Sequence, residues 1–188
     1  GIGSKDSKVY CIVRQTEGDF VARMDSDGFA YLAKMPGGWA PGGTCDEEGA
    51  LLVTTDAKHI WRLPDIDTLD GFSQPWDGLP QMEDLGATSS SHGFDVVVWE
   101  GWLVSAHHSG NIVVTDLTDR GLTTSKLSSA GGDELPRGAG CGAAFLSGGD
   151  LYVVGNNAAG LYKVEIQLEA GSFTATRVGE SWNGGKND

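Results

Sequence analysis

Residues 138–178 read GAGCGAAFLSGGDLYVVGNNAAGLYKVEIQLEAGSFTATRV, and this stretch decides the predicted fold. It holds four short runs of apolar and β-branched residues, which begin at Ala143, Leu151, Leu161 and Phe173. Gly, Asn and Ser residues separate the runs, and these residue types favour tight turns. The stretch therefore predicts a meander of four short antiparallel strands.

Similar pairs of β-prone runs recur at near-regular intervals along the chain. They begin near residues 10, 52, 103 and 152, so the spacings are 42, 51 and 49 residues. Repeats of about 40–50 residues are typical of propeller blades. We therefore expect an all-β protein, a β-propeller built of about four four-stranded antiparallel blades, as a complete ring or as part of a larger one. The single predicted domain, residues 1–188, divides into blades at residues 1–38, 39–80, 90–130 and 138–188.

The stretches between the predicted blades are irregular and contain many turn-forming residues. Gln74–Gly93 is the longest of them, and Ser128–Gly140 is a second linker. We expect loops there, because Gly and Pro weaken or interrupt central strands. The predicted core comes from the apolar runs, and it contains Val97, Leu103, Ile112, Tyr152, Val154, Leu161 and Val164.

The composition indicates a turn-rich and acidic protein. Of the 188 residues, 29 are Gly and only 6 are Pro, which favours many turns over disorder. The 26 acidic and 13 basic residues give a net charge of −13, which argues against nucleic acid and anionic membranes as partners. The apolar runs are too short for membrane insertion. We expect an extracellular or cell-surface protein.

Residues 150–164, DLYVVGNNAAGLYKV, resemble the repeat of YVTN-type propellers. They are more loosely similar to the repeats of the NHL and gluconolactonase-like propellers. In these families a Leu-Tyr-Val run, a polar turn and a second apolar strand occur once per blade. The resemblance implies a fold and no particular activity, because the repeat is a structural element.

The gluconolactonase-like propellers imply one alternative function. In that family a calcium ion in the central channel activates a sugar-lactone substrate, and acidic and Asn residues at the ends of inner strands hold the ion. The residues of this chain that are suitably placed are Asp46, Glu47, Glu48 and Asp95. The resemblance therefore implies a calcium-dependent hydrolase as an alternative.

A rim of turns and linkers is the predicted binding site. In a propeller, the turns between the second and third strands lie on the same face as the linkers between blades. The turn residues are Arg14, Gln15, Asp56, Ala57, His107, His108, Asn156 and Asn157, and the linkers carry Trp39, Trp76 and Trp182. Polar and aromatic side chains together suit contacts with protein or carbohydrate. The alternative is that each Trp packs between adjacent blades as part of the core.

The sequence predicts no metal site. His107 and His108 are adjacent, and adjacent residues of a strand point to opposite faces, so the two cannot hold one metal ion together. The run Asp65-x-Asp67-x-x-Asp70 resembles a calcium-binding loop, but no Glu closes it. We expect a turn there and no cofactor, with Ca²⁺ as the alternative.

The three cysteines are too few for a disulfide scaffold, and they lack the CxxC spacing of many zinc sites. Cys11 and Cys45 fall on strands of neighbouring predicted blades, so they are a candidate disulfide. Cys141 would then remain without a disulfide partner.

No catalytic motif of the GxSxG, HExxH or paired-carboxylate kind occurs in the sequence. We interpret the chain as a non-enzymatic, extracellular module for protein interaction or assembly, such as a subunit of a larger surface structure or filament. Both ends of the chain resemble parts of one inner strand, and an unpaired strand edge is a template for another chain. We therefore expect self-assembly, with the edge at Gly184, Gly185, Asn187 and Asp188. A lectin that binds carbohydrate and the calcium-dependent hydrolase are the alternatives.

Overall fold

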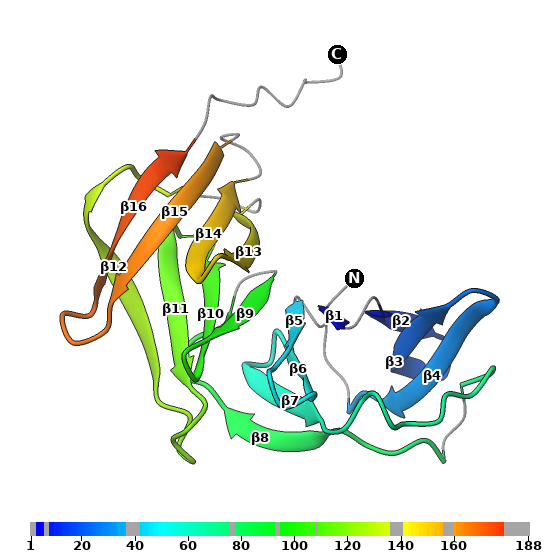
Figure 1. The fold of residues 1–188 in the computed structure, drawn as a ribbon. Helices are drawn as coiled ribbons and strands as arrows, with labels where there is room; N and C mark the ends of the chain where they lie inside the picture. The colour runs from blue at the N-terminus through cyan, green and yellow to red at the C-terminus, as the bar shows by residue number, and fades with distance from the viewer. Residues whose placement is uncertain are drawn as a thin grey trace. The chain divides into compact units, whose positions relative to one another are not determined.

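The protein is all-β, as the sequence predicts (Figure 1). The computed structural model describes residues 3–5, 8–36, 42–75, 78–92, 95–107, 109–135, 141–155 and 160–178. These residues form sixteen strands in three sheets. The described ranges contain no helix, and hence none that could span a membrane. The chain divides into two compact units, Gly1–Ala87 (unit 1) and Thr88–Asp188 (unit 2).

Unit 1 contains two separate four-stranded sheets, and each is an antiparallel meander. The first sheet consists of β1 (Gly3–Lys5), β2 (Lys8–Gln15), β3 (Gly18–Asp25) and β4 (Gly28–Lys34). The second sheet consists of β5 (Gly42–Cys45), β6 (Leu51–Thr54), β7 (His59–Leu63) and β8 (Glu83–Ala87). β8 lies within Gln74–Gly93, which the sequence predicts to be a loop. The prediction misses this strand because most of its residues are acidic or small rather than apolar.

The core of unit 1 lies between its two sheets. Alternate residues of a strand point to opposite faces, so one face of each sheet supplies the apolar side chains. The buried cluster draws Tyr10, Val21 and Leu32 from the first sheet, and Leu51 and Val53 from the second. Burial of these side chains is the main favourable contribution to the folding of unit 1.

Unit 2 contains eight strands in one continuous sheet. Its first meander consists of β9 (Val96–Trp99), β10 (Trp102–His107), β11 (Asn111–Asp116) and β12 (Thr124–Gly132). Its second meander consists of β13 (Cys141–Ser147), β14 (Asp150–Gly155), β15 (Gly160–Gln167) and β16 (Ser172–Val178). The two meanders join where β12 pairs with β16 in parallel. The sheet curls, so that β13 lies close to β9 and β10 (Figure 1).

The predicted four-bladed propeller is therefore wrong. Four blades would form four separate sheets of four strands, whereas the two meanders of unit 2 share one eight-stranded sheet. The error arises at Ser128–Gly132, which the sequence analysis assigns to a linker but which forms the second half of β12. A Cβ atom on Gly132 would overlap the Ala175 carbonyl oxygen, and the φ angle of Gly132 is +80°. Glycine thus allows the close approach of β12 to β16.

The core of unit 2 lies between its two meanders. The buried cluster includes Val104 and Ile112 from the first meander, and Val153, Val164 and Phe173 from the second. Among the predicted core residues, the buried ones are Leu103, Ile112 and Val164, and the half-buried ones are Val97, Tyr152, Val154 and Leu161. Three of the half-buried residues lie one position away from an inward-pointing neighbour on β14 or β15, so the alternation places them on the opposite face.

Candidate functional site

Most residues of the predicted rim and the whole predicted assembly edge lie outside the described residues. These are Trp39, Trp76, Trp182, His108, Asn156, Asn157, Gly184, Gly185, Asn187 and Asp188. Of the predicted rim, the structure describes Arg14, Gln15, Asp56, Ala57 and His107. His107 is buried at the end of β10. Its Nδ1 atom lies 2.7 Å from Ser109 Oγ. The rim and the edge stay predictions.

A second buried histidine, His92, lies in the predicted loop before β9 and has no signal in the sequence. Its Nδ1 atom lies 2.9 Å from Ser105 Oγ, and its Nε2 atom lies 2.8 Å from Thr115 Oγ1. Thr115 Oγ1 in turn lies 2.9 Å from Thr124 Oγ1. Burial, reinforced by the nearby His107, lowers the pKa of His92 to about 3. His92 is therefore neutral at physiological pH and fully hydrogen-bonded.

This buried network stabilises the fold and is not a catalytic site. Ser105 and Thr115 have no exposed surface, so no substrate can reach their hydroxyl groups. The neutral imidazole of His92 lies between the hydroxyl groups of Ser105 on β10 and Thr115 on β11, so all three buried polar side chains have hydrogen-bond partners. The consequence is a pH dependence of stability in unit 2.

Cys11 and Cys45 are both half-buried thiols in this structure. Cys11 packs against the cluster around Phe20, and its Sγ atom lies 3.7 Å from the Ala22 carbonyl oxygen. Cys45 packs against the core cluster that contains Tyr10. Because adjacent residues of β2 point to opposite faces, Cys11 lies on the face away from Tyr10. Burial raises the pKa of the Cys11 thiol.

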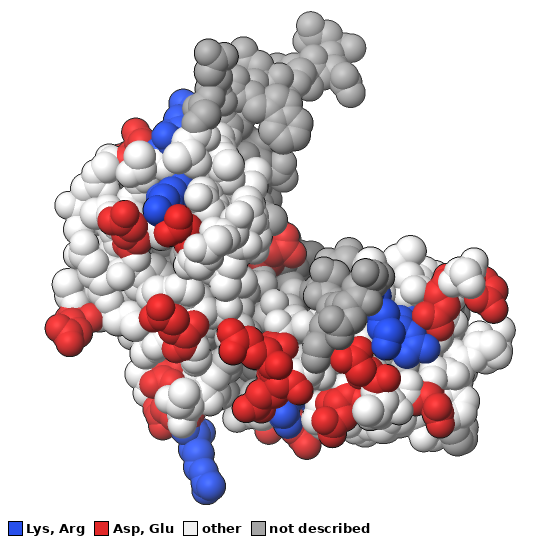
Figure 2. Space-filling model, viewed as in Figure 1, with Lys and Arg blue, Asp and Glu red and all other residues white. Residues whose placement is uncertain are grey.

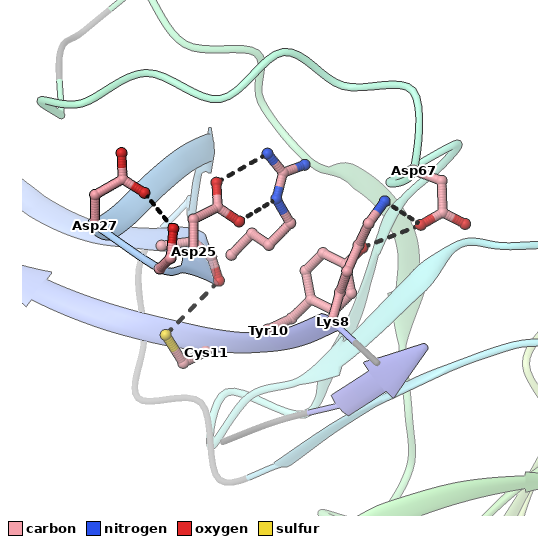
Figure 3. Close-up of polar contacts among 9 residues, drawn as sticks. Lys8, Tyr10, Cys11, Asp25, Asp27 and Asp67 are labelled. Carbon is pink, nitrogen blue, oxygen red and sulfur yellow. Dashed lines mark hydrogen bonds and ion pairs between the residues drawn. The ribbon is translucent and has the colours of Figure 1, made fainter. Parts of the chain in front are cut away.

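The acidic run after β7 forms a turn that ties the two sheets of unit 1 together (Figure 3). Asp67 Oδ1 accepts hydrogen bonds from Tyr10 Oη and Lys8 Nζ, each at 3.3 Å. Burial and the Asp67 carboxylate raise the pKa of Tyr10 to about 12. Asp65 adopts a positive φ of 52° in the turn. Within the described ranges, no three His, Cys, Asp or Glu side chains are grouped as a metal site would need.

The acidic residues that the gluconolactonase resemblance points to are divided between the two units. Asp46 accepts a hydrogen bond from the Ala50 backbone N–H at 2.8 Å and so caps the turn between β5 and β6. Glu48 lies 3.8 Å from Arg62 in an exposed ion pair. Asp95 belongs to unit 2, where burial raises the pKa of its carboxyl group.

The surface feature that stands out in unit 1 is an apolar patch on the first sheet. Val9 lies directly opposite Met24, and Met24 lies opposite Phe29, so all three side chains share the face away from the core. Phe72 lies next to them, because it pairs with Tyr31, two residues beyond Phe29. The exposed fractions are 40% for Val9, 54% for Met24, 43% for Phe29 and 43% for Phe72. We call these four residues the apolar patch.

The other half of the same face is covered. Phe20, Ala22 and Tyr31 are buried there together with Leu79, which comes from the segment between β7 and β8. Phe20 and Tyr31 pack edge to face with their ring centroids 5.9 Å apart. One half of this face is therefore built like a core, and the other half is exposed.

The ion pairs of Lys8 and Arg23 lie on the face of the sheet opposite to the apolar patch, because these residues share that face with Tyr10. Arg23 holds Asp25 through two hydrogen bonds of 2.8 and 3.1 Å, and Lys8 pairs with Asp67 (Figure 3). Asp27 accepts a hydrogen bond from Ser26 Oγ and has no cationic partner among the described residues. Figure 2 shows acidic side chains spread over the visible face of the protein, in agreement with the net charge of −13.

The edges of β4 and β8 in unit 1 are protected against pairing with another chain. The Phe72 backbone forms two hydrogen bonds with Tyr31, and the Lys34 N–H donates to the Pro80 carbonyl at 3.0 Å, so the β4 edge is covered. The β8 edge carries Glu83 and Asp84 and a register shift. Charged residues and bulges discourage strand addition. A partner of unit 1 would therefore contact a face rather than these edges.

Comparisons with known proteins leave the geometry as the only guide to function. No protein-family model matches the chain, and no characterised protein matches its sequence. No match supports the resemblance to propeller repeats, which rests on the sequence alone. The propeller fold that it implies is wrong. The apolar patch is the feature from which a function can be argued.

Proposed function

We propose that this protein is a protein-interaction module and that its docking surface is the apolar patch of unit 1. The partner is a different protein, with an apolar face set in a basic surface. The observation that carries the proposal is the cross-strand row of Val9, Met24 and Phe29, three large apolar side chains exposed side by side. Adjacent exposed apolar side chains of this kind mark interaction sites more often than isolated ones do.

The composition of the apolar patch supports protein contact. Met and Phe are enriched at the centres of interfaces, because they bury much area for few polar atoms. The β2–β4 backbone beneath the apolar patch is a paired sheet, so binding would not require the backbone to become ordered. A preformed apolar surface binds a partner more tightly than a flexible surface of the same buried area, because less conformational entropy is lost on binding.

The charge supports a different protein over a second copy of this chain. Two copies would bring together two molecules of net charge −13, and Asp27 adds a negative charge beside Met24 and Phe29. Like charges across an interface disfavour association, whereas a basic partner would be attracted at long range. The partner that the charge favours is therefore an unlike chain rather than a second copy of this one.

The test uses a synthetic amphipathic peptide of Leu and Lys residues as the probe, with the full chain and fluorescence anisotropy as the readout. We expect the wild-type chain to bind it and Met24→Glu to weaken binding roughly tenfold or more, because a buried Met contributes about 1.5–3 kcal/mol. Leu146→Glu is the matched control, since Leu146 is an exposed apolar residue of unit 2. This control should bind as the wild type does.

Two results would contradict the proposal. Equal binding of a Lys and Ser peptide of the same charge would show that charge alone attracts the probe. A dimer in sedimentation experiments that Met24→Glu dissociates would show that the apolar patch binds a second copy.

A further inference from the structure

A polar groove lies at the end of the first sheet opposite to the apolar patch. The turn between β2 and β3, the end of β4 and Gln81 line it, and its volume is about 640 Å³. Small-ligand sites have volumes of about 300–1,000 Å³. Arg14 is five residues further along β2 than Val9, which is about 17 Å, so the groove and the apolar patch are separate.

The guanidinium of Arg14 is fixed in the groove by Asp19. Arg14 Nε donates to Asp19 Oδ1 at 2.8 Å, and Nη2 donates to Oδ2 at 2.9 Å. These hydrogen bonds hold the pKa of Asp19 below its ordinary value. Arg14 Nη1 makes no hydrogen bond to a described residue, so its donors are available to a ligand in a fixed direction.

Two amide side chains complete the polar lining. Gln15 Nε2 donates to Tyr31 Oη at 3.0 Å, which leaves the Gln15 carbonyl oxygen as an acceptor. Gln81 lies between two buried residues, Leu79 and Met82, which anchor its backbone. Its side-chain amide makes no hydrogen bond to the described part of the chain, so it can both donate and accept.

The backbone keeps the groove open at Gly18. This residue has a φ of +134°, and a Cβ atom there would lie 3.6 Å from Lys34 Cε. A larger side chain would project toward Lys34 and narrow the groove. Pro36, exposed at the other end, offers a small apolar surface.

The Arg14–Asp19 ion pair and the net charge of the chain argue against a strongly anionic ligand in the groove. Arg14 is neutralised by Asp19, and Lys34 Nζ lies 6.0 Å from the centre of the Phe20 ring. The net charge of −13 repels anions at long range. What remains is a set of fixed hydrogen-bond donors and acceptors beside the single positive charge of Lys34.

We infer that this groove binds a neutral oligosaccharide. Neighbouring sugar hydroxyls each donate and accept hydrogen bonds, and the groove offers spare groups of both kinds at the end of β2, from Arg14 on one face of the strand and from Gln15 on the other, together with Gln81. A peptide in extended form would need a sheet edge, and the backbone pairing of Lys34 with Gln81 occupies the edge of β4 there. The site does not depend on the proposed function of the apolar patch.

The test is a printed array of neutral and acidic oligosaccharides probed with the labelled full chain, followed by titration of the neutral sugars that bind. Arg14→Ala and Gln81→Ala should each weaken binding about five- to tenfold, the effect of one lost hydrogen-bonding group. Arg62→Ala is the matched control, because Arg62 is also paired with carboxylates in unit 1 but lies outside the groove. It should bind as the wild type does, and circular dichroism should show all three variants folded.

Several results would overturn the inference. The first is that the chain binds no neutral oligosaccharide, and the second is that it binds acidic oligosaccharides alone. The third is that neither Arg14→Ala nor Gln81→Ala weakens the binding. A Met24→Glu chain that retains sugar binding but loses peptide binding would separate this site from the apolar patch.

Discussion

In unit 1 two four-stranded meanders remain separate sheets, whereas in unit 2 two meanders of the same size share one continuous sheet. Unit 1 is held by the apolar cluster between its sheets and by the polar link from Asp67 to Tyr10. Unit 2 has a similar apolar cluster, but it adds the backbone pairing of β12 with β16 and a buried histidine network. Two meanders with the same number of strands can therefore remain separate sheets or join into one, and the backbone pairing between them decides which.

The largest effect should come from breaking the junction in unit 2. Gly132→Ala should destabilise the protein by about 3–5 kcal/mol, because the new methyl group would overlap the Ala175 carbonyl oxygen. Gly148→Ala is the matched control: Gly148 also has a positive φ, of +62°, but a Cβ atom there meets nothing within 4 Å. It should cost only about 1 kcal/mol. Urea unfolding measures both values, and equal values would contradict the role of Gly132.

The next effect concerns acid stability and should be confined to unit 2. The pKa of His92 is about 3 in the folded state, well below its ordinary value of 6.5. Stability is therefore complete above pH 6.5 and is lost as the pH falls toward 3, by about 2–3 kcal/mol at pH 4.5. Hydrogen exchange of the β10 and β11 amides at pH 7 and at pH 4.5 measures this loss of stability. His92→Gln should have a flatter pH profile, and an unchanged profile would contradict the assignment.

A smaller effect at alkaline pH should appear in unit 1. The pKa of Tyr10 is raised to about 12 from an ordinary value of 10. The folded state thus favours the neutral phenol, and stability that is complete below pH 10 is lost as the pH rises toward 12, by roughly 1 kcal/mol at pH 11. Tyr10→Phe should remove this dependence while costing about 1 kcal/mol at neutral pH for the lost hydrogen bond. Exchange rates of β2 amides provide the measurement.

The smallest effect should come from the apolar patch. Met24→Glu should change the free energy of unfolding by less than about 0.5 kcal/mol, because Met24 is more than half exposed. Ala22 lies two residues before Met24 on β3 and on the same face of the sheet. Ala22→Glu should unfold unit 1, because Ala22 is fully buried. Thermal unfolding distinguishes the two. A strongly destabilised Met24→Glu would show that the apolar patch belongs to the core.

Local sequence patterns predict the strands well where apolar residues alternate. The run that begins at Leu161 becomes β15, and the run that begins at Phe173 becomes β16. The pattern fails at Ser128–Gly132 and Glu83–Ala87, which contain few apolar residues and are strands because a distant backbone pairs with them. Such pairing leaves no periodic signal in the strand's own residues.

The candidate sites could be predicted only in part. The turn at Arg14 and Gln15 is named in the sequence analysis as part of a rim, but its partner Gln81 lies in a predicted loop. Nothing in the sequence marks Val9 and Met24 as exposed, since alternation says which side chains share a face and not what covers that face. The exposure of the apolar patch depends on how far the segment that carries Leu79 extends across the sheet.

The segment that carries Phe72 and Leu79 has a consequence for solubility. It covers both the β4 edge and half of an apolar sheet face, and Gly71 allows its close approach, since a Cβ there would overlap that of Ala30. A single local opening would expose an unpaired strand edge together with the rings of Phe20 and Tyr31. Edges and apolar faces that become accessible together are the template for cross-β aggregation. The rate at which the protein aggregates would then follow the opening of this one segment, long before either unit unfolds.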